Sequence, residues 1–341
     1  MKHLGLVLLG LAVATFAAAA AQQQPVQVDD AAITSDHYPA RLSDYRFFAD
    51  LAKRTPAPRV IGYDLETALF SDYTVKQRFI YVPAGAKAKY DPAGAFGFPV
   101  GSALIKTFGY GEGASFKPLE TRLLLRRASG WVALPYVWNA EGTDAVLKRA
   151  GTRLAVTFTD PSGKPRQISY AVPNQNQCKD CHALAGQIAP IGPKARYLNH
   201  NSQLQKLVAA GLLDRAPADA PRVARWDDPK APLEARARAY LEINCAHCHN
   251  PAGAASNSGL FLELDRKAAV TLGIGKRPVA AGRGSGGREF AIQPGDAEAS
   301  ILIYRLRSTD PGIAMPELGR ATAHDEGIDL LSQWIDSMPA R

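Results

Sequence analysis

Residues 167–182 read Gln-Ile-Ser-Tyr-Ala-Val-Pro-Asn-Gln-Asn-Gln-Cys-Lys-Asp-Cys-His. The β-branched and aromatic residues of Gln167–Val172 predict a strand. Directly after that strand comes the pattern Cys-x-x-Cys-His, formed by Cys178, Cys181 and His182. We therefore expect the first half of the chain to form a β-rich segment that ends in this cysteine–histidine motif.

The same pattern recurs as Cys245-Ala246-His247-Cys248-His249, and the two copies contain every cysteine of the chain. Cys-x-x-Cys-His is the pattern of covalent c-type haem attachment. Two thiols at this spacing reach the vinyl groups on one porphyrin edge, and the next histidine ligates the iron. Two covalently bound haems c are predicted, with these attachment and axial residues: Cys178, Cys181, His182, Cys245, Cys248 and His249.

Three other interpretations of the cysteines remain open but are less favoured. A zinc ribbon needs about 15–20 residues between its cysteine pairs, whereas 63 residues separate Cys181 from Cys245. A thioredoxin-like redox motif needs a single pair in a βαβ pattern and no histidine after it. Two disulfides within the motifs would close very small, strained loops.

The N-terminal residues have the order of a secretory signal peptide. Lys2 and His3 form a basic start, Leu4–Phe16 is almost wholly apolar, and Ala17–Ala21 is composed of small residues. We therefore predict a signal peptide over 1–21, cleaved near Ala21, and a periplasmic protein without a stable membrane span. An uncleaved anchor is the alternative, because the apolar run only just reaches spanning length.

Composition places the chain among ordinary globular proteins. Of its 341 residues 46% are hydrophobic and 21% charged, which excludes a disordered chain and a multi-span membrane protein. The formal net charge is +8, but the basic residues are scattered. Nucleic-acid binding is not expected, since it would need a basic stripe or a recognised module. At this length two folded domains are the expectation.

The fold class expected is α+β, with a β-rich domain over 41–200 that carries the haem motif 178–182. A flexible stretch over 22–40 precedes this domain. One helix is expected within it, capped by Thr143 and closed by Gly151. The predicted strands are Arg78–Val82, Ala103–Tyr110, Leu119–Arg126, Trp131–Trp138, Arg153–Phe158 and Gln167–Val172.

A connecting helix and linker over 201–230 are predicted to lead to an all-α domain over 231–341, which carries the haem motif 245–249. Pro232 suits the first turn of a helix that runs into the second motif. Asp296 is the expected N-cap of another helix. The last helix is stopped by Pro339, and its apolar face consists of Ile328, Leu331, Trp334 and Ile335.

Met315 is the predicted sixth ligand of the second iron, because a proline- and glycine-rich loop presents its soft thioether sulfur. Its alternative role is to fill the core, the role expected of Met338. For the first iron, His200 is a low-ranking candidate, with a surface loop histidine or an open, water-bound iron as alternatives. His247 is expected to be a solvent-facing spacer, and His324 to help start the last helix.

Two resemblances extend these expectations over longer stretches. A helix running into Cys-x-x-Cys-His, then Met-Pro and a final helix, resembles a class I cytochrome c domain over 231–341. That implies helices crossing over the haem and Met315 as sixth ligand. From Leu42 to Met338 the chain is similar to a family of bacterial exported dihaem c-type cytochromes. The resembling stretches include Tyr63-Asp64-Leu65, Tyr136-Val137-Trp138-Asn139 and Met315-Pro316-Glu317-Leu318-Gly319-Arg320. This similarity labels a family and brings no reaction with it.

A third resemblance covers the first domain only. Phe98-Pro99-Val100-Gly101, Lys106, Gly130-Trp131 and the final Cys-x-x-Cys-His resemble small monohaem cytochromes that oxidise hydroxylamine. This implies an open distal iron face and a lysine cross-linked to the porphyrin, for which Lys106 is the candidate. The ordinary alternative is that Lys106 is a solvent-exposed strand lysine.

The function expected from the sequence is single-electron transfer between periplasmic redox partners. One alternative is a haem enzyme whose open first iron reduces peroxide or oxidises a small nitrogen compound. Another is the electron-accepting subunit of an exported dehydrogenase. The expected partners are other periplasmic redox proteins.

Overall fold

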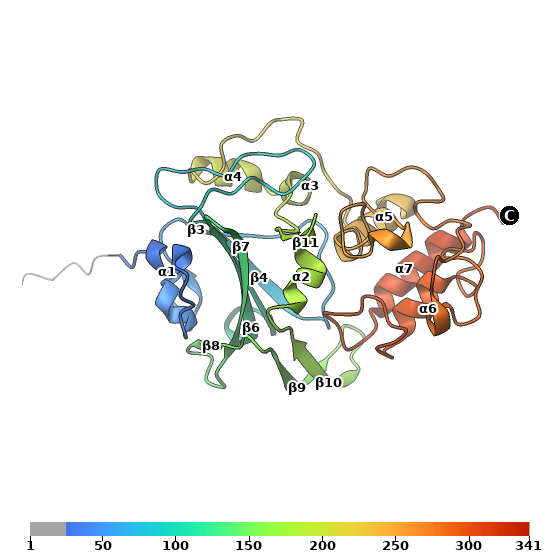
Figure 1. Ribbon diagram of the computed structural model, residues 1–341, viewed down its shortest axis with the longest axis horizontal. Helices are drawn as coiled ribbons and strands as arrows, with labels where there is room; N and C mark the ends of the chain where they lie inside the picture. Colours follow the sequence, from blue (N-terminus) through green and yellow to red (C-terminus); the bar gives the residue numbers. More distant parts are fainter. Residues whose placement is uncertain (1–24, 341) are drawn as a thin grey trace, which may run out of the picture.

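The computed structural model describes residues 25–340, so the predicted signal peptide 1–21 lies outside the described residues. Its largest unit is a six-stranded antiparallel sheet in which neighbours in space are also neighbours in sequence. Figure 1 shows this sheet with helices on both sides. The strands are β3 (Val60–Tyr63), β4 (Val75–Tyr81), β5 (Ala103–Tyr110), β6 (Lys117–Arg127), β7 (Gly130–Trp138) and β8 (Ala145–Leu147).

Three two-stranded sheets accompany the large sheet. They are β1 (Phe48–Asp50) with β2 (Thr55–Pro56), β9 (Thr152–Thr159) with β10 (Pro165–Val172), and β11 (Ala183–Leu184) with β12 (Gln187–Ile188). The six strands predicted from the sequence all coincide with β4–β7, β9 and β10, which confirms those predictions. The α-helices are α1 (Asp30–Thr34), α2 (Gln177–His182), α3 (Ala195–Leu198), α4 (Gln203–Ala209), α5 (Leu233–Asn244), α6 (Ile301–Arg307) and α7 (Asp325–Asp336).

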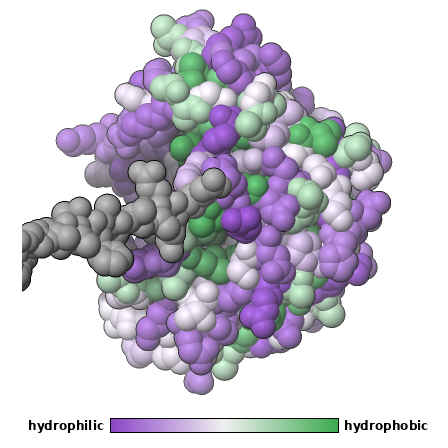
Figure 2. All heavy atoms as spheres, turned by 90° about the vertical axis from the view of Figure 1, so that its left-hand side faces the viewer, coloured by the Kyte–Doolittle hydropathy of each residue, from purple (hydrophilic) through white to green (hydrophobic). Residues whose placement is uncertain are grey.

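The two faces of the large sheet are buried differently. One face packs Ile105, Leu123 and Tyr136 against Ile33 of α1. Figure 2 views the molecule from this side, where hydrophilic residues cover most of the surface. On the other face apolar residues such as Leu104 pack under α3 and α4 at one end. The remainder of that second face is polar and lies beneath α2, where the first motif is located.

The all-α class I cytochrome c-like domain predicted for 231–341 is wrong. Helices α5, α6 and α7 do pack around one apolar cluster. Between Cys248 and Ser300, however, the chain forms turns, short 3-10 helices and isolated β-bridges such as Ile274–Ile292. Glycines with positive φ, among them Gly273 at +95°, interrupt any helix there. The molecule is thus β-rich, and its helices are short.

Two local helix predictions also need correction. Thr143 does not cap a helix, because the Asn139 side-chain oxygen accepts the Thr143 amide and closes a tight turn into β8. Asp296 is not the N-cap of α6, because that helix begins at Ile301 and its N-cap is Ser300. In contrast, α5 begins after Pro232 and α7 buries its predicted apolar face. None of the helices over 25–340 has the length and apolar composition of a membrane span.

Asp72 joins the sheet side of the molecule to the loop before α7. Its buried carboxylate accepts hydrogen bonds from the amides of Ala321 and Thr322, at 2.7 and 2.9 Å. Asp72 also has a left-handed backbone, with φ of 49°, which Asp and Asn tolerate better than most residues.

We expect Asp72→Ala to lower the free energy of unfolding by about 2–4 kcal/mol, because two amides lose their acceptor. Urea unfolding of the purified chain measures this change. Asp72→Asn is the matched control, since it retains an acceptor oxygen and tolerates the same backbone. Equal stability of the Ala and Asn variants would contradict this role for Asp72.

Candidate cofactor site

The first motif forms the short helix α2. Asn174 and Gln177 exchange two hydrogen bonds between side chain and backbone, which starts the helical turn directly after β10. Residues three and four positions apart share one face of a helix. Cys178, Cys181 and His182 are therefore brought together on one side of α2.

His182 has the arrangement of a metal-binding imidazole. Its Nδ1 lies 2.9 Å from the carbonyl oxygen of Ala189. A carbonyl only accepts, so Nδ1 carries the proton and the lone pair of Nε2 remains free. Burial lowers the pKa of His182 to about 4. The ring is consequently neutral at physiological pH, which is the form that binds metals.

The second motif continues from the end of α5 as one helical turn, in which the amides of Cys248 and His249 donate to the Cys245 carbonyl. His249 is buried, and its Nδ1 lies 3.2 Å from Ser258 Oγ. The Ser258 hydroxyl donates its proton to Ala255, so it accepts from the imidazole. His249 Nε2 therefore remains free as well, and burial lowers the pKa of His249 to about 4.

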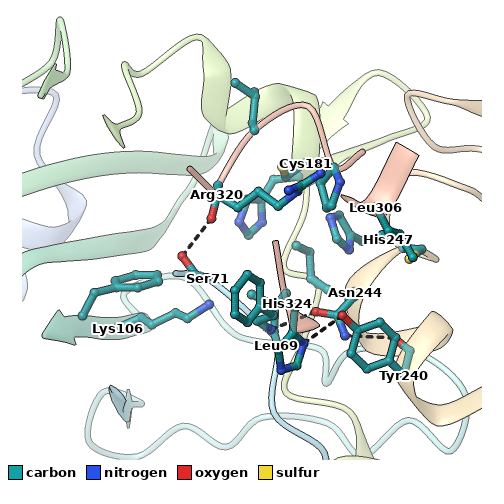
Figure 3. A pocket seen from close by; sticks show the side chains of 18 of the residues that line it. Leu69, Ser71, Lys106, Cys181, Tyr240, Asn244, His247, Leu306, Arg320 and His324 are labelled. Atoms are coloured by element: carbon teal, nitrogen blue, oxygen red, sulfur yellow. Dashed lines mark hydrogen bonds between the residues drawn. The ribbon is translucent and has the colours of Figure 1, made fainter. Parts of the chain in front are cut away.

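Residues of both motifs, Cys181 and His182 of the first and Cys245 and His247 of the second, line one cavity of about 100 Å³. Figure 3 shows Lys106 on one side of this cavity, with Cys181 and His247 across from it. The sheet contributes Lys106, Phe108 and Arg122, the motifs contribute Cys181, His182, Cys245 and His247, and the second half adds Leu306, Pro316, Arg320 and His324. The sequence did not indicate a shared cavity.

Cys181, His247 and Cys248 form the contact between the motifs, with their ligand atoms all within 4.8 Å of one another. His247 is not the solvent-facing spacer expected from the sequence. It lines the cavity, and its Nδ1 is buried without a hydrogen-bond partner among residues 25–340. The hydrogen bond between the two thiols lowers the pKa of Cys181 and raises that of Cys248.

A row of cations crosses the sheet above this cavity. Arg78, Lys106 and Arg122 lie directly opposite one another on β4, β5 and β6. Like charges in this position repel each other. Arg78 Nη2 is buried without a partner in the described chain, and the Lys106 ammonium lies 4.8 Å from the Phe108 ring centroid. Lys106 is therefore not the exposed strand lysine of the ordinary alternative.

Glu120 supplies negative charge beside this row. It is fully buried, accepts a hydrogen bond of 2.9 Å from Arg122 Nε, and accepts another of 2.6 Å from the Tyr170 hydroxyl. Lys106 has no ion-pair partner among the described residues. Burial, followed by the repulsion of Arg78, lowers the pKa of Lys106 well below its usual value. Of the three cations in the row, Arg122 is paired with Glu120, whereas Arg78 Nη2 and the Lys106 amine have no acidic partner among the described residues.

Met315 lies beside the cavity rather than within its described walls. Its neighbour Pro316 lines the cavity. Arg320 stabilises this loop, because its Nη2 donates to the carbonyls of Met315, Arg305 and Ser308. Side-chain ligation by Met315 remains a prediction.

His200 lies in a different hollow, lined also by Glu66 and Arg225. Its Nδ1 is 3.1 Å from Glu66 Oε2, and its Nε2 is 2.7 Å from Gln203 Nε2. Both ring nitrogens are thus engaged away from His182. The structure does not bring His200 to the first motif.

His324 is a cavity residue that the sequence reasoning missed. Its ring stacks on Phe70 with centroids 4.1 Å apart, and its Nδ1 lies 2.9 Å from the Tyr240 hydroxyl. Gly327 makes this possible, since a Cβ there would meet the Tyr240 hydroxyl at 2.3 Å. His324 does stand at the N-cap of α7 as expected, but its side chain caps no amide.

The donor set fits c-type haem. None of the four thiols forms a disulfide, each motif has an imidazole whose Nδ1 is engaged by an oxygen atom, and the amine of Lys106 lines the cavity without an acidic partner among the described residues. The competing set is Cys181, His247 and Cys248, which suits a thiophilic metal ion. It uses only part of the arrangement and leaves His182 and His249 without a role. Neither a protein-family model, a curated protein nor a solved structure matches this chain.

Proposed function

We propose that the protein is a periplasmic dihaem c-type cytochrome that transfers single electrons between exported redox partners. The observation that carries this proposal is the hydrogen bonding of His182 and His249. In each motif Nδ1 is engaged by an oxygen atom, which leaves the lone pair of Nε2 for a metal ion. Such outer hydrogen bonds orient metal-binding histidines and make them better ligands. When bound, the haem iron supplies one-electron redox chemistry.

The residues of the chain have separate tasks in this proposal. Cys178 and Cys181 attach one group, and Cys245 and Cys248 attach the other. The Lys106 amine on β5 can donate to a carboxylate at the first site, whereas Arg122 on β6 is already paired with Glu120, and the apolar ring of Phe108 helps to exclude water from the site. The net positive charge favours acidic protein partners.

Intact-mass analysis of the full chain, matured in a host with a c-type haem attachment system, tests the proposal. We expect the mass of two haems bound to a chain that lacks its first 21 residues. A chain with zinc or copper but without a tetrapyrrole would overturn the proposal in favour of the Cys181–His247–Cys248 metal set. A full-length product would contradict signal cleavage alone.

Met315→Ala should abolish the weak charge-transfer absorption, at the red end of the spectrum, that a sulfur-ligated ferric haem gives. It should also lower the reduction potential of one haem, because a thioether ligand raises it. Met338→Leu is the matched control, since Met338 packs against the core of the second half. Wild-type protein without this absorption, or a Met338 variant that loses it, would contradict ligation by Met315.

A second candidate is a haem enzyme with an open first iron, and it is favoured by the surroundings of His182. The described cavity wall that contains His182 includes no methionine, and its other histidines are His247 of the second motif and His324, whose Nδ1 is engaged by the Tyr240 hydroxyl. If this candidate is correct, cyanide should bind rapidly to one haem of the oxidised protein, seen as a high-spin to low-spin change in the EPR spectrum. Two low-spin haems that do not react with cyanide would support the carrier alone.

A further inference from the structure

We infer that Cys181 and Cys248 join the two haem sites into a single electronically coupled unit, rather than two independent centres. This inference rests on the proposed function, because it concerns groups attached through these thiols. It goes further by stating how close the two attachment points lie. The sequence contains no information on that separation.

The contact between the motifs is direct. The sulfur atoms of Cys181 and Cys248 lie within 4.8 Å of each other, although 66 residues separate them in the chain. The Cys248 thiol also donates to the carbonyl oxygen of Asp180, at 3.4 Å. A side chain of the second motif therefore touches both the backbone and a side chain of the first.

Hydrogen bonds made by residues near each motif fix the position of one motif against the other. The Ala185 amide, three residues after the first motif, donates to the Ala252 carbonyl at 3.0 Å. At the other motif the Asn244 side chain, next to Cys245, accepts the amide of Phe70 at 2.8 Å. Together with the Asp72 hydrogen bonds, these connections make the contact between the motifs part of the fold.

The short distance between the two sulfurs bears on electron transfer because each sulfur would be bonded to a porphyrin. A thioether sulfur is bonded directly to a side group of the porphyrin. With these two sulfurs within 4.8 Å of each other and of a ring nitrogen of His247, porphyrins attached through them would be joined to the chain at neighbouring points. Electrons should equilibrate between the two sites faster than with any partner, and the two sites should titrate as an interacting pair.

The contact itself can be tested without haem. In unloaded full-length chain, diamide should link Cys181 to Cys248, since it accepts the two electrons and two protons that the thiols release. Peptide mass mapping identifies the linked cysteines. Links found only within the motifs, Cys178–Cys181 and Cys245–Cys248, would overturn the contact.

The coupling is tested in the loaded protein by circular dichroism of the Soret band. We expect a bisignate signal that exceeds the sum of the signals from two single-haem variants, Cys178→Ser/Cys181→Ser and Cys245→Ser/Cys248→Ser. If intact mass shows two haems but the wild-type signal equals that sum, the coupling is wrong and the proposed function stands. If no haem is attached, the proposed function fails, and the diamide result still decides the contact.

Discussion

Serine in place of both Cys178 and Cys181 should leave the chain with one covalently bound haem instead of two. The thiols of the first motif serve only their own site, because the second motif has its own pair at the end of α5. The reciprocal double variant, at Cys245 and Cys248, should also retain one haem. Intact mass and peroxidase-type haem staining of denaturing gels measure the loss.

A matched control exists within the first motif. Lys179 is an exposed spacer between the two cysteines, and Lys179→Ala should retain both haems. Loss of both groups from either double variant would show that the motifs do not act separately. Retention of both groups in a double variant would refute covalent attachment through those cysteines.

Glu120→Ala should lower the free energy of unfolding by about 3–5 kcal/mol, because it removes one partner of a buried ion pair. Arg122 would then remain beside Lys106 and Arg78 without the carboxylate that it now contacts. The Tyr170 hydroxyl would lose its acceptor as well. Chemical unfolding of the unloaded chain measures the effect without the contribution of a bound group.

Two further variants separate charge from packing at this site. Glu120→Ala/Arg122→Met should recover part of the lost stability, because the unpaired cation is removed together with its partner. Glu120→Gln should be intermediate, since the amide oxygen still accepts from Tyr170. If Glu120→Ala unfolds like wild type, the buried cation row does not depend on Glu120.

The sequence predicted those parts of the fold that depend on neighbouring residues. Strands such as β5 and β7 have β-branched and aromatic residues between clear turn signals, and α7 repeats apolar residues at helical spacing. The segment between Cys248 and Ser300 was mispredicted, because the resemblance to a helical domain outweighed its many glycines. Tertiary contacts decide the structure of such segments.

For the candidate site as well, the local motifs could be predicted from the sequence and the tertiary contacts could not. Both cysteine motifs are evident in the sequence, because their chemistry requires a fixed local spacing. The cavity positions of His247 and Lys106 depend on strand register and on the meeting of two distant segments. Neither is encoded in any short pattern. His200 was a candidate ligand because it is a histidine that follows the first motif in the sequence. In the structure its ring nitrogens contact Glu66 and Gln203 instead.

The meeting of Cys181 with Cys248 also has a consequence for biogenesis. All four thiols are already partly covered in the closed chain, and Cys181 of the first motif lies against Cys248 of the second. An attachment machinery needs open access to each cysteine pair in turn. If the motifs carry haem as proposed, attachment would have to precede the closing of the two halves, and the last folding step would follow it.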